Sequence, residues 1–216
     1  MARANRNRRR NIQSTYEDCI RPYISGKSVL NVGCVAHDAS KRTEEPFTHD
    51  LIRKDADSVL GIDILEDEIQ ELQKSGYNVE YGDVQNLNIN KNFDVVVLSE
   101  VIEHLTNFDG LMESINNHLR SNGKVIITTP NILAVRCFAM ELFNMDWVNQ
   151  THTCYFEKST LEQLIEKYDY MVIEWNYSND LSLRITDPLQ SVGWVLERTL
   201  PDRVGSTTLG AVIKKR

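Results

Sequence analysis

Residues 28–64 read SVLNVGCVAHDASKRTEEPFTHDLIRKDADSVLGIDI, and this segment has the pattern of a strand, a connecting helix and a second strand. Its two short apolar runs are Val29–Val32 and Val59–Ile62, and the residues between them are polar and can form a helix. Two strands joined in this way favour a right-handed βαβ unit with parallel strands. The segment therefore predicts an α/β fold.

The residues that follow the two strands are those expected at a nucleoside site. Gly33 ends the first strand, where a glycine lets a ligand approach the backbone, and Asp63 ends the second, where a carboxylate can accept both ribose hydroxyls. Dinucleotide folds hold a pyrophosphate on a G-x-G-x-x-G loop, but residues 33–38 read GCVAHD, with one glycine. The loop disfavours an NAD-dependent dehydrogenase and indicates a nucleoside ligand without a pyrophosphate.

The same loop resembles the first motif of the class I S-adenosyl-L-methionine (SAM)-dependent methyltransferases. That motif ends in an acidic or Asn residue, an apolar residue and then Gly-Cys-Gly, and residues 31–35 here read NVGCV. SAM has a cationic sulfonium and no phosphate, which suits one glycine and an acidic surrounding. Residues 100–105, EVIEHL, and 128–131, TTPN, resemble the branch that contains the ubiquinone-biosynthesis O-methyltransferases. The resemblance extends over roughly residues 27–175 and implies SAM as the cofactor.

The other apolar patterns supply the rest of a sheet. Strands are expected at residues 77–81, 93–98, 124–128, 171–177 and 207–213, and helices at 12–24, 48–57, 67–75, 109–119 and 160–167. Ser159 is expected to cap the last of these helices. The resemblance implies a doubly wound, mostly parallel seven-stranded α/β sheet in the order 3-2-1-4-5-7-6, with strand 7 antiparallel and helices on both faces.

The length of 216 residues and the ordinary apolar share suit one domain. We expect a basic arm and a leading helix over residues 1–26, and then a single SAM-binding domain over 27–216 with a lid insertion near 132–150. Residues 181–204 have no assigned element. Because the chain has neither a transmembrane run nor a signal-peptide core, and its four cysteines are scattered, a cytoplasmic protein with reduced thiols is expected.

Charge bears on the choice of partner. The net charge of −7 argues against a general nucleic-acid binder, although the first ten residues hold five arginines. This arm is interpreted either as a solvated terminus or as a contact for RNA or an anionic membrane. The favoured partner is a small-molecule acceptor, and nothing in the sequence indicates an oligomeric state.

The resemblance also implies a set of cofactor-binding residues. Gly33 would face the methionine part of SAM, Asp63 the ribose, and Asp83 with Val84 the adenine. Asp83 can also be interpreted as the cap of the turn that follows it. The full set of expected cofactor residues is Asn31, Gly33, Cys34, Asp63, Ile64, Asp83, Val84, Ser99 and Glu100.

Two histidines are candidates for removing the proton of an acceptor hydroxyl, because histidine is the usual base near neutral pH. His104 follows the fourth strand, and His152 lies on the loop after the lid segment. The remaining three histidines, His37, His49 and His118, are expected to be structural or exposed.

A divalent metal is a second interpretation of this region. Glu100, Glu103 and His104 have the spacing i, i+3 and i+4, so they can share one face of a helix, and His152 would add a second imidazole. Such a set suits Mg²⁺, Mn²⁺ or Zn²⁺. The resemblance implies this ion in the ubiquinone-pathway enzymes and, with the later histidine, in the small-RNA 3′-terminal 2′-O-methyltransferases. Without a metal, Glu100 would border the cofactor, and Glu103 and His104 would serve hydrogen bonding at the start of a helix.

The function expected from these features is SAM-dependent methyl transfer to an oxygen of a small molecule. Two alternatives stay open. One is an RNA 2′-O-methyltransferase with a metal-assisted site, and the other is a catalytically silent scaffold that retains the fold.

Overall fold

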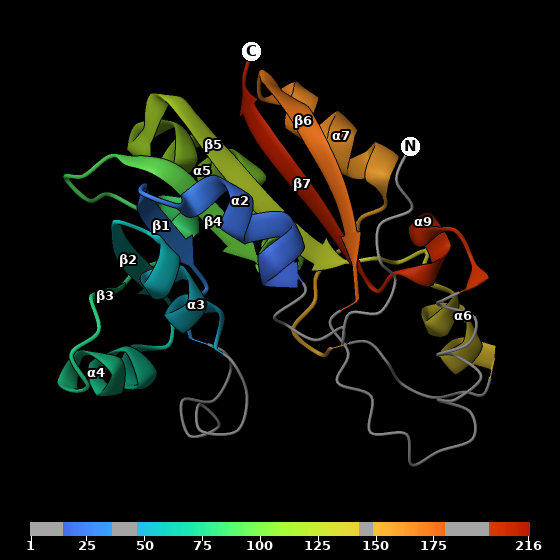
Figure 1. The fold of residues 1–216 in the computed structure, drawn as a ribbon, viewed down its shortest axis with the longest axis horizontal. Coiled ribbons are helices and arrows are strands. Elements are labelled where there is room, and N and C mark those ends of the chain that lie inside the picture. The colour runs from blue at the N-terminus through green and yellow to red at the C-terminus, as the bar shows by residue number, and fades with distance from the viewer. Residues whose placement is uncertain (1–14, 36–46, 143–148, 180–198) are drawn as a thin grey trace.

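A seven-stranded sheet in the order β3-β2-β1-β4-β5-β7-β6 forms the centre of the computed structural model (Figure 1). The pairs among β1 to β5 are parallel, and β7 runs antiparallel to both β5 and β6. The predicted fold class is confirmed. The strands are β1 (Ser28–Val32), β2 (Ser58–Asp63), β3 (Val79–Tyr81), β4 (Phe93–Ser99), β5 (Leu119–Pro130), β6 (Tyr170–Ser178) and β7 (Thr208–Lys215).

The structure describes residues 15–35, 47–142, 149–179 and 199–216. The arginine arm, His37 and most of the unassigned segment 181–204 lie outside the described residues. The division into an arm, a domain and a lid therefore stays a prediction.

Alternating side chains of the central strand β4 enter two different cores. Val96 and Leu98 pack on the face covered by α5 (Phe108–His118) and α7 (Lys158–Lys167). Val95 and Val97 pack on the other face, against η1 (Tyr16–Ile20), α2 (Arg21–Ile24) and α3 (Thr48–Asp55). A third group of apolar side chains lies under α4 (Glu66–Lys74) beside β3. Helices thus cover both faces, as a buried parallel sheet requires (Figure 1).

The leading helix differs from the one expected at residues 12–24. Its described part begins as a π-helix, η1, and continues as α2, with Pro22 in the first turn of α2. The Arg21 N–H donates to the Tyr16 carbonyl of η1, and Pro22, which has no N–H to donate, lies where the π-helix changes to an α-helix. The hydroxyl of Tyr16 then ties η1 to α3 by donating to the Leu51 carbonyl at 2.8 Å and to Asp55 Oδ2 at 2.6 Å.

The cap of α7 corrects a prediction. Glu157, and not Ser159, is the N-cap, because the helix begins at Lys158. Glu157 Oε1 accepts from the Thr160 backbone N–H at 2.9 Å, while the Glu157 N–H donates to Thr160 Oγ1 at 3.1 Å. This reciprocal pair satisfies two donors that would otherwise lack partners.

The expected lid segment contains one short described helix, α6 (Val135–Leu142), beside α9 (Asp202–Gly205) (Figure 1). Phe138 and Leu142 are 66% and 67% exposed, and no residue of α6 is buried. Residues 143–148 lie outside the described residues, so the lid interpretation stays a prediction. None of the described helices has the length and apolar character needed to cross a membrane.

Candidate functional site

A cavity of about 620 Å³ opens where β1, β2 and β4 end. Ligands bind at the carboxyl ends of strands in open α/β sheets, so the cavity lies where this fold expects a ligand. His104 and His152 both line it. Of the expected cofactor residues, the cavity is lined by Asn31, Gly33, Cys34, Asp63, Ile64, Ser99 and Glu100.

Gly33 turns the chain directly after β1. Its φ of 69° lies in the left-handed region, and a Cβ atom there would lie 2.5 Å from Val101 Cγ2. Its N–H donates to the Ile62 carbonyl of β2 at 2.9 Å, which keeps the turn close to the sheet. A side chain at this position would be strained and would clash, so the sequence needs a glycine here.

Asp63 connects the end of β2 to the loop after β1. Its side chain is buried, Oδ2 accepts from the Val35 N–H at 2.9 Å, and Oδ1 accepts from the Leu65 N–H at 3.2 Å. The carboxylate also lines the cavity, and carboxylate oxygens accept hydrogen bonds from hydroxyl groups. The carboxylate therefore shapes the loop and can also bind the hydroxyls of a ligand.

Asp83 and Val84 do not belong to the described residues that line the cavity. Asp83 instead caps the 3₁₀-helix η3 (Val84–Asn86), where Oδ1 accepts from the Gln85 N–H at 2.8 Å, and Val84 is buried in the apolar core. The local turn thus uses the Asp83 carboxylate as the alternative interpretation expected. The adenine contact of both residues stays a prediction.

His49 and His118, which are not candidates for the chemistry, are both buried and hydrogen-bonded. The Asn31 amide lies 2.9 Å from His49 Nδ1, and His49 lines the cavity, which the sequence reasoning missed. His118 is structural: Nδ1 lies 2.6 Å from the Ser114 carbonyl, and Nε2 accepts from the Ile89 N–H at 3.0 Å. Neither residue is exposed.

Glu103 lies on the 3₁₀-helix η4 (Ile102–His104) and is fully buried. The Thr129 hydroxyl at the end of β5 donates to Glu103 Oε2 at 3.0 Å. Within the described part of the chain, Oε1 is buried and accepts from no N–H or hydroxyl group. The Glu100 carboxyl lies close enough to hydrogen-bond with that of Glu103.

Burial raises the pKa of Glu103 to about 7, because removing water disfavours the charged carboxylate. The Glu103 backbone N–H, the Thr129 hydroxyl and the nearby Glu100 carboxyl lower the pKa but do not cancel this effect. Near neutral pH the group is therefore divided between its protonated and ionised forms. A nearby cation would favour the ionised form.

The raised pKa predicts that the metal-free protein loses stability as the pH rises. The unfolded carboxyl has a pKa near 4.5, so the folded state holds the extra proton between pH 4.5 and about 7, and the free energy of unfolding falls across this range. The contribution of Glu103 is at most about 3 kcal/mol, at about 1.36 kcal/mol per pKa unit. Urea unfolding at pH 5 and pH 8 with a chelator measures it. Glu103→Gln is expected to reduce the pH dependence, and an equal dependence in the variant would contradict this assignment.

Glu100 adopts an unusual backbone conformation directly after β4. Its φ is 55°, and its N–H donates to the Thr128 carbonyl at 3.0 Å. A residue with a Cβ atom pays a conformational cost in the left-handed region, and such positions cluster at functional sites. This conformation places a carboxyl group at the cavity beside Glu103.

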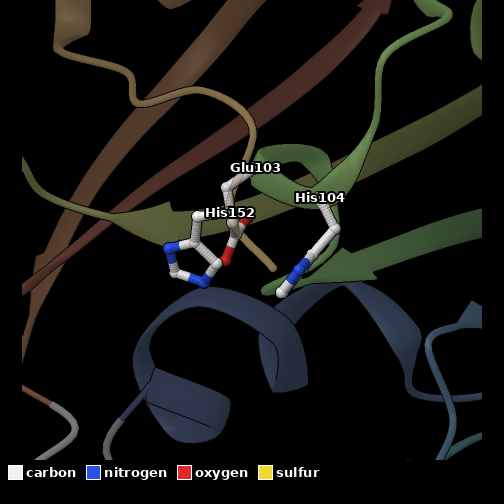
Figure 2. Close-up of side chains that lie close together, drawn as sticks. All are labelled: Glu103, His104 and His152. Atoms are coloured by element: carbon white, nitrogen blue, oxygen red, sulfur yellow. The ribbon is translucent and has the colours of Figure 1, made fainter. Parts of the chain in front are cut away.

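Glu103, His104 and His152 converge, although the last lies on a distant loop. Each residue offers one possible ligand atom, and these atoms all lie within 4.8 Å of one another. The two imidazole rings meet edge to face, with centroids 4.6 Å apart, and Figure 2 shows the three side chains directed toward one another. Glu100 is not part of this group of three. Its role as a metal ligand stays a prediction.

The loop that carries His152 is fixed to η4 by hydrogen bonds. The Thr153 N–H donates to the Glu103 carbonyl at 2.8 Å, and its hydroxyl donates to the Leu105 carbonyl at 2.7 Å. His152 Nδ1 lies 3.1 Å from the Tyr155 hydroxyl. The sequence alone does not predict these partners, although the segment THTCY at 151–155 is rich in hydroxyl residues.

The chain is similar to known methyltransferases in sequence and in fold. The sequence model of the Methyltransferase domain family matches residues 4–174. The ubiquinone biosynthesis O-methyltransferase of Rickettsia prowazekii is 30% identical over 127 residues, which are 56% of this chain and 44% of that protein. The match therefore spans less than half the length of this curated relative.

Solved structures share the fold at low sequence identity. A SAM-dependent methyltransferase from Archaeoglobus fulgidus has a TM-score of 0.60 at 18% identity, over 90% of this chain and 89% of that chain. The 1,6-didemethyltoxoflavin-N1-methyltransferase of Burkholderia thailandensis, solved with bound 1,6-didemethyltoxoflavin and S-adenosylhomocysteine, has a TM-score of 0.55 at 14% identity, over 88% and 72%. The family match, together with the sheet order, shows that the chain belongs to the methyltransferase-domain family within the class I SAM-dependent methyltransferases.

Proposed function

We propose that this methyltransferase methylates a hydroxyl oxygen of a small molecule at a site that also binds a divalent cation. One observation carries the proposal: Glu103, His104 and His152 converge at the same cavity that Gly33 and Asp63 line. The cavity would thus place a nucleoside cofactor next to a set of metal-binding or proton-accepting groups.

The cofactor half of the cavity is assigned from its chemistry. The backbone at Gly33 would allow close approach of the methionine part, and the Asp63 carboxylate, which lines the same cavity, would accept from the ribose hydroxyls. Ser99 and Glu100 line the same cavity and would border the side of the sulfonium. When SAM is bound, it supplies a methyl group on a positively charged sulfur. Holding this group in line with an acceptor oxygen can lower the activation free energy by roughly 7–11 kcal/mol.

The residues of the second half fit a divalent cation. One carboxylate and two imidazoles suit Mn²⁺ or Zn²⁺, with Mg²⁺ using the carboxylate and water. The buried Glu103 Oε1 supports this fit, because a buried carboxylate oxygen normally has a hydrogen-bond donor or a cation as its partner. A bound ion would supply Lewis acidity toward an acceptor hydroxyl.

Proton removal is the other role of the two histidines. An imidazole nitrogen that binds a cation cannot accept a proton as well, so His104 and His152 cannot both be ligands and bases through the same atoms. Without the ion, His104 or His152 would take the proton of the acceptor. Dependence of the reaction on a metal therefore decides between these two roles.

The size and charge of the molecule support a small acceptor. A cavity of about 620 Å³ has the volume of a small-molecule site. The net charge of −7 disfavours binding to the phosphates of RNA. The identity of the acceptor atom is the least constrained part of the proposal, because one of the related structures is an N-methyltransferase.

A methyl-transfer assay tests the proposal. Radiolabelled SAM is supplied with a catechol, which has vicinal hydroxyls, or with the matched monohydroxybenzene, each with Mn²⁺ or with a chelator. We expect label in the catechol only, and only with the metal. Transfer to an RNA with a 3′-terminal ribose, but not to the catechol, would replace the small-molecule assignment with the RNA alternative. Binding of S-adenosylhomocysteine without transfer to any acceptor would contradict the proposed activity and favour the scaffold.

A further inference from the structure

We infer that Thr151 and Asn149 are positioning residues that fix the tautomer of His104, with the proton on Nδ1 and the lone pair on Nε2. The inference concerns the hydrogen bonds of the metal-free protein. Its meaning for catalysis rests on the proposed function, in which His104 is a metal ligand or a base.

The Thr151 backbone fixes the orientation of the Asn149 amide. The Thr151 backbone N–H donates to Asn149 Oδ1 at 3.1 Å. A backbone N–H can only donate, so the amide must turn its oxygen and not its NH₂ group toward it. The two ends of an asparagine amide are assigned from their partners, and here this partner admits one orientation.

The Asn149 amide in turn fixes the direction of the Thr151 hydroxyl proton. Oγ1 donates its single proton to the same Asn149 Oδ1 at 2.9 Å, and it lies 3.0 Å from His104 Nδ1. With its proton used, Oγ1 faces the ring with a lone pair. The Thr151 carbonyl, which can only accept, lies 3.3 Å from the same Nδ1. The Thr151 hydroxyl oxygen and the Thr151 carbonyl are therefore both acceptors toward His104 Nδ1, and the ring nitrogen donates to them.

The chemistry of imidazole then decides which nitrogen of His104 holds the lone pair. A neutral ring has one protonated nitrogen, so a proton on Nδ1 leaves the lone pair of His104 on Nε2. That lone pair is what binding a cation or accepting a proton requires, and partners of the other nitrogen commonly set it in metal sites. Tyr155, in contrast, can donate to or accept from His152 Nδ1, so this contact alone does not fix the second ring.

Nitrogen-15 NMR of histidine side chains in the full-length, chelated protein, at a pH where the imidazoles are neutral, reads the tautomer directly. We expect the Nδ1–H form for His104. Thr151→Ser keeps the hydroxyl and should preserve this form. Thr151→Val removes the nearer of the two acceptors and leaves only the carbonyl at 3.3 Å, so the population should shift toward the Nε2–H form that imidazole prefers in water. Asn149→Ala should shift it in the same direction, because the Thr151 hydroxyl then becomes able to donate to Nδ1.

His118 is an internal control for folding in these spectra. Its Nδ1 lies 2.6 Å from the Ser114 carbonyl, and its Nε2 lies 3.0 Å from both the N–H and the carbonyl of Ile89, so its signals should be unchanged in every variant. An unchanged His104 tautomer in both Thr151→Val and Asn149→Ala, with His118 intact, would overturn the inference. An Nε2–H form in the wild-type protein would do so too.

Manganese affinity supplies a second readout. We expect Thr151→Val to weaken Mn²⁺ binding by about tenfold or more, the size of effect that partners of ligating histidines have, and Thr151→Ser to restore it. The NMR result needs neither SAM nor an acceptor. A protein that shows the expected tautomer but transfers no methyl group would thus retain this inference and lose only the proposed function.

Discussion

Replacing Asp63 with alanine is expected to weaken the binding of S-adenosylhomocysteine by at least about 1.5 kcal/mol, the lower value for a hydrogen bond to a charged group. Under the proposed function, the variant would lack the acceptor for the ribose hydroxyls. It also leaves the Val35 and Leu65 N–H groups without their carboxylate, so the loop after β1 loses its anchor on β2. Isothermal titration calorimetry measures the loss, which corresponds to a tenfold or larger rise in Kd.

Asp94 provides a matched control for this prediction. Its Oδ2 accepts from the Ser28 N–H at 2.9 Å, and its Oδ1 pairs with Arg120 at 2.8 Å, both at the starts of strands and away from the cavity. Asp94→Ala removes a carboxylate that also anchors backbone, so it should lower stability but leave the Kd of S-adenosylhomocysteine unchanged. Wild-type affinity in Asp63→Ala, or an equal loss in both variants, would contradict the assignment of Asp63.

Replacing Glu103 with glutamine is expected to abolish metal-dependent methyl transfer while making the chelated protein more stable at pH 8. Glutamine keeps an oxygen for the Thr129 hydroxyl but removes the carboxylate of the metal group. It also removes a buried charge, whose cost falls on the folded state above its pKa of about 7. We expect transfer to fall by about 100-fold or more, the scale of several kcal/mol that a Lewis acid supplies, and the Tm at pH 8 to rise.

Glu157→Gln is the control for the same chemical change. The hydrogen bonds from the backbone N–H groups of Ser159 and Thr160 lower the pKa of Glu157, so its charge stabilises the fold and its loss should reduce the Tm. Methyl transfer should be retained, since Glu157 is not among the described residues that line the cavity. The two variants therefore change stability in opposite directions. Full activity in Glu103→Gln would show that the carboxylate is not part of the reaction.

The sequence patterns predicted the sheet well and the local helix starts less well. Strands such as β4 are continuous apolar runs that can only be buried, and the resemblance supplied their order. Ser159, in contrast, is the more usual type of N-cap residue, but α7 begins at Lys158, so Ser159 lies inside the helix and Glu157 becomes the cap. The helix register, set by packing along its whole length, decides which residue becomes the cap.

The candidate site divides in a similar way. Gly33, Asp63 and the segment EVIEHL follow strands directly, so the ends of a parallel sheet place them together. Thr129 and Thr151 contact Glu103 and His104 from segments far away in the sequence, and their positions depend on the path of the loop that η4 holds. Hydroxyl residues are common on loops, so only the folded structure reveals which ones contact the site.

The metal site is tested most directly by titrating the wild-type protein with Mn²⁺ in the presence of S-adenosylhomocysteine and measuring the bound ion by electron paramagnetic resonance. If Glu103, His104 and His152 form a metal site, the wild-type protein should bind one Mn²⁺ per chain. His152→Ala should lose this Mn²⁺ and still bind S-adenosylhomocysteine. No stoichiometric Mn²⁺ in the wild type, or the same binding in His152→Ala, would contradict a metal site at this cavity.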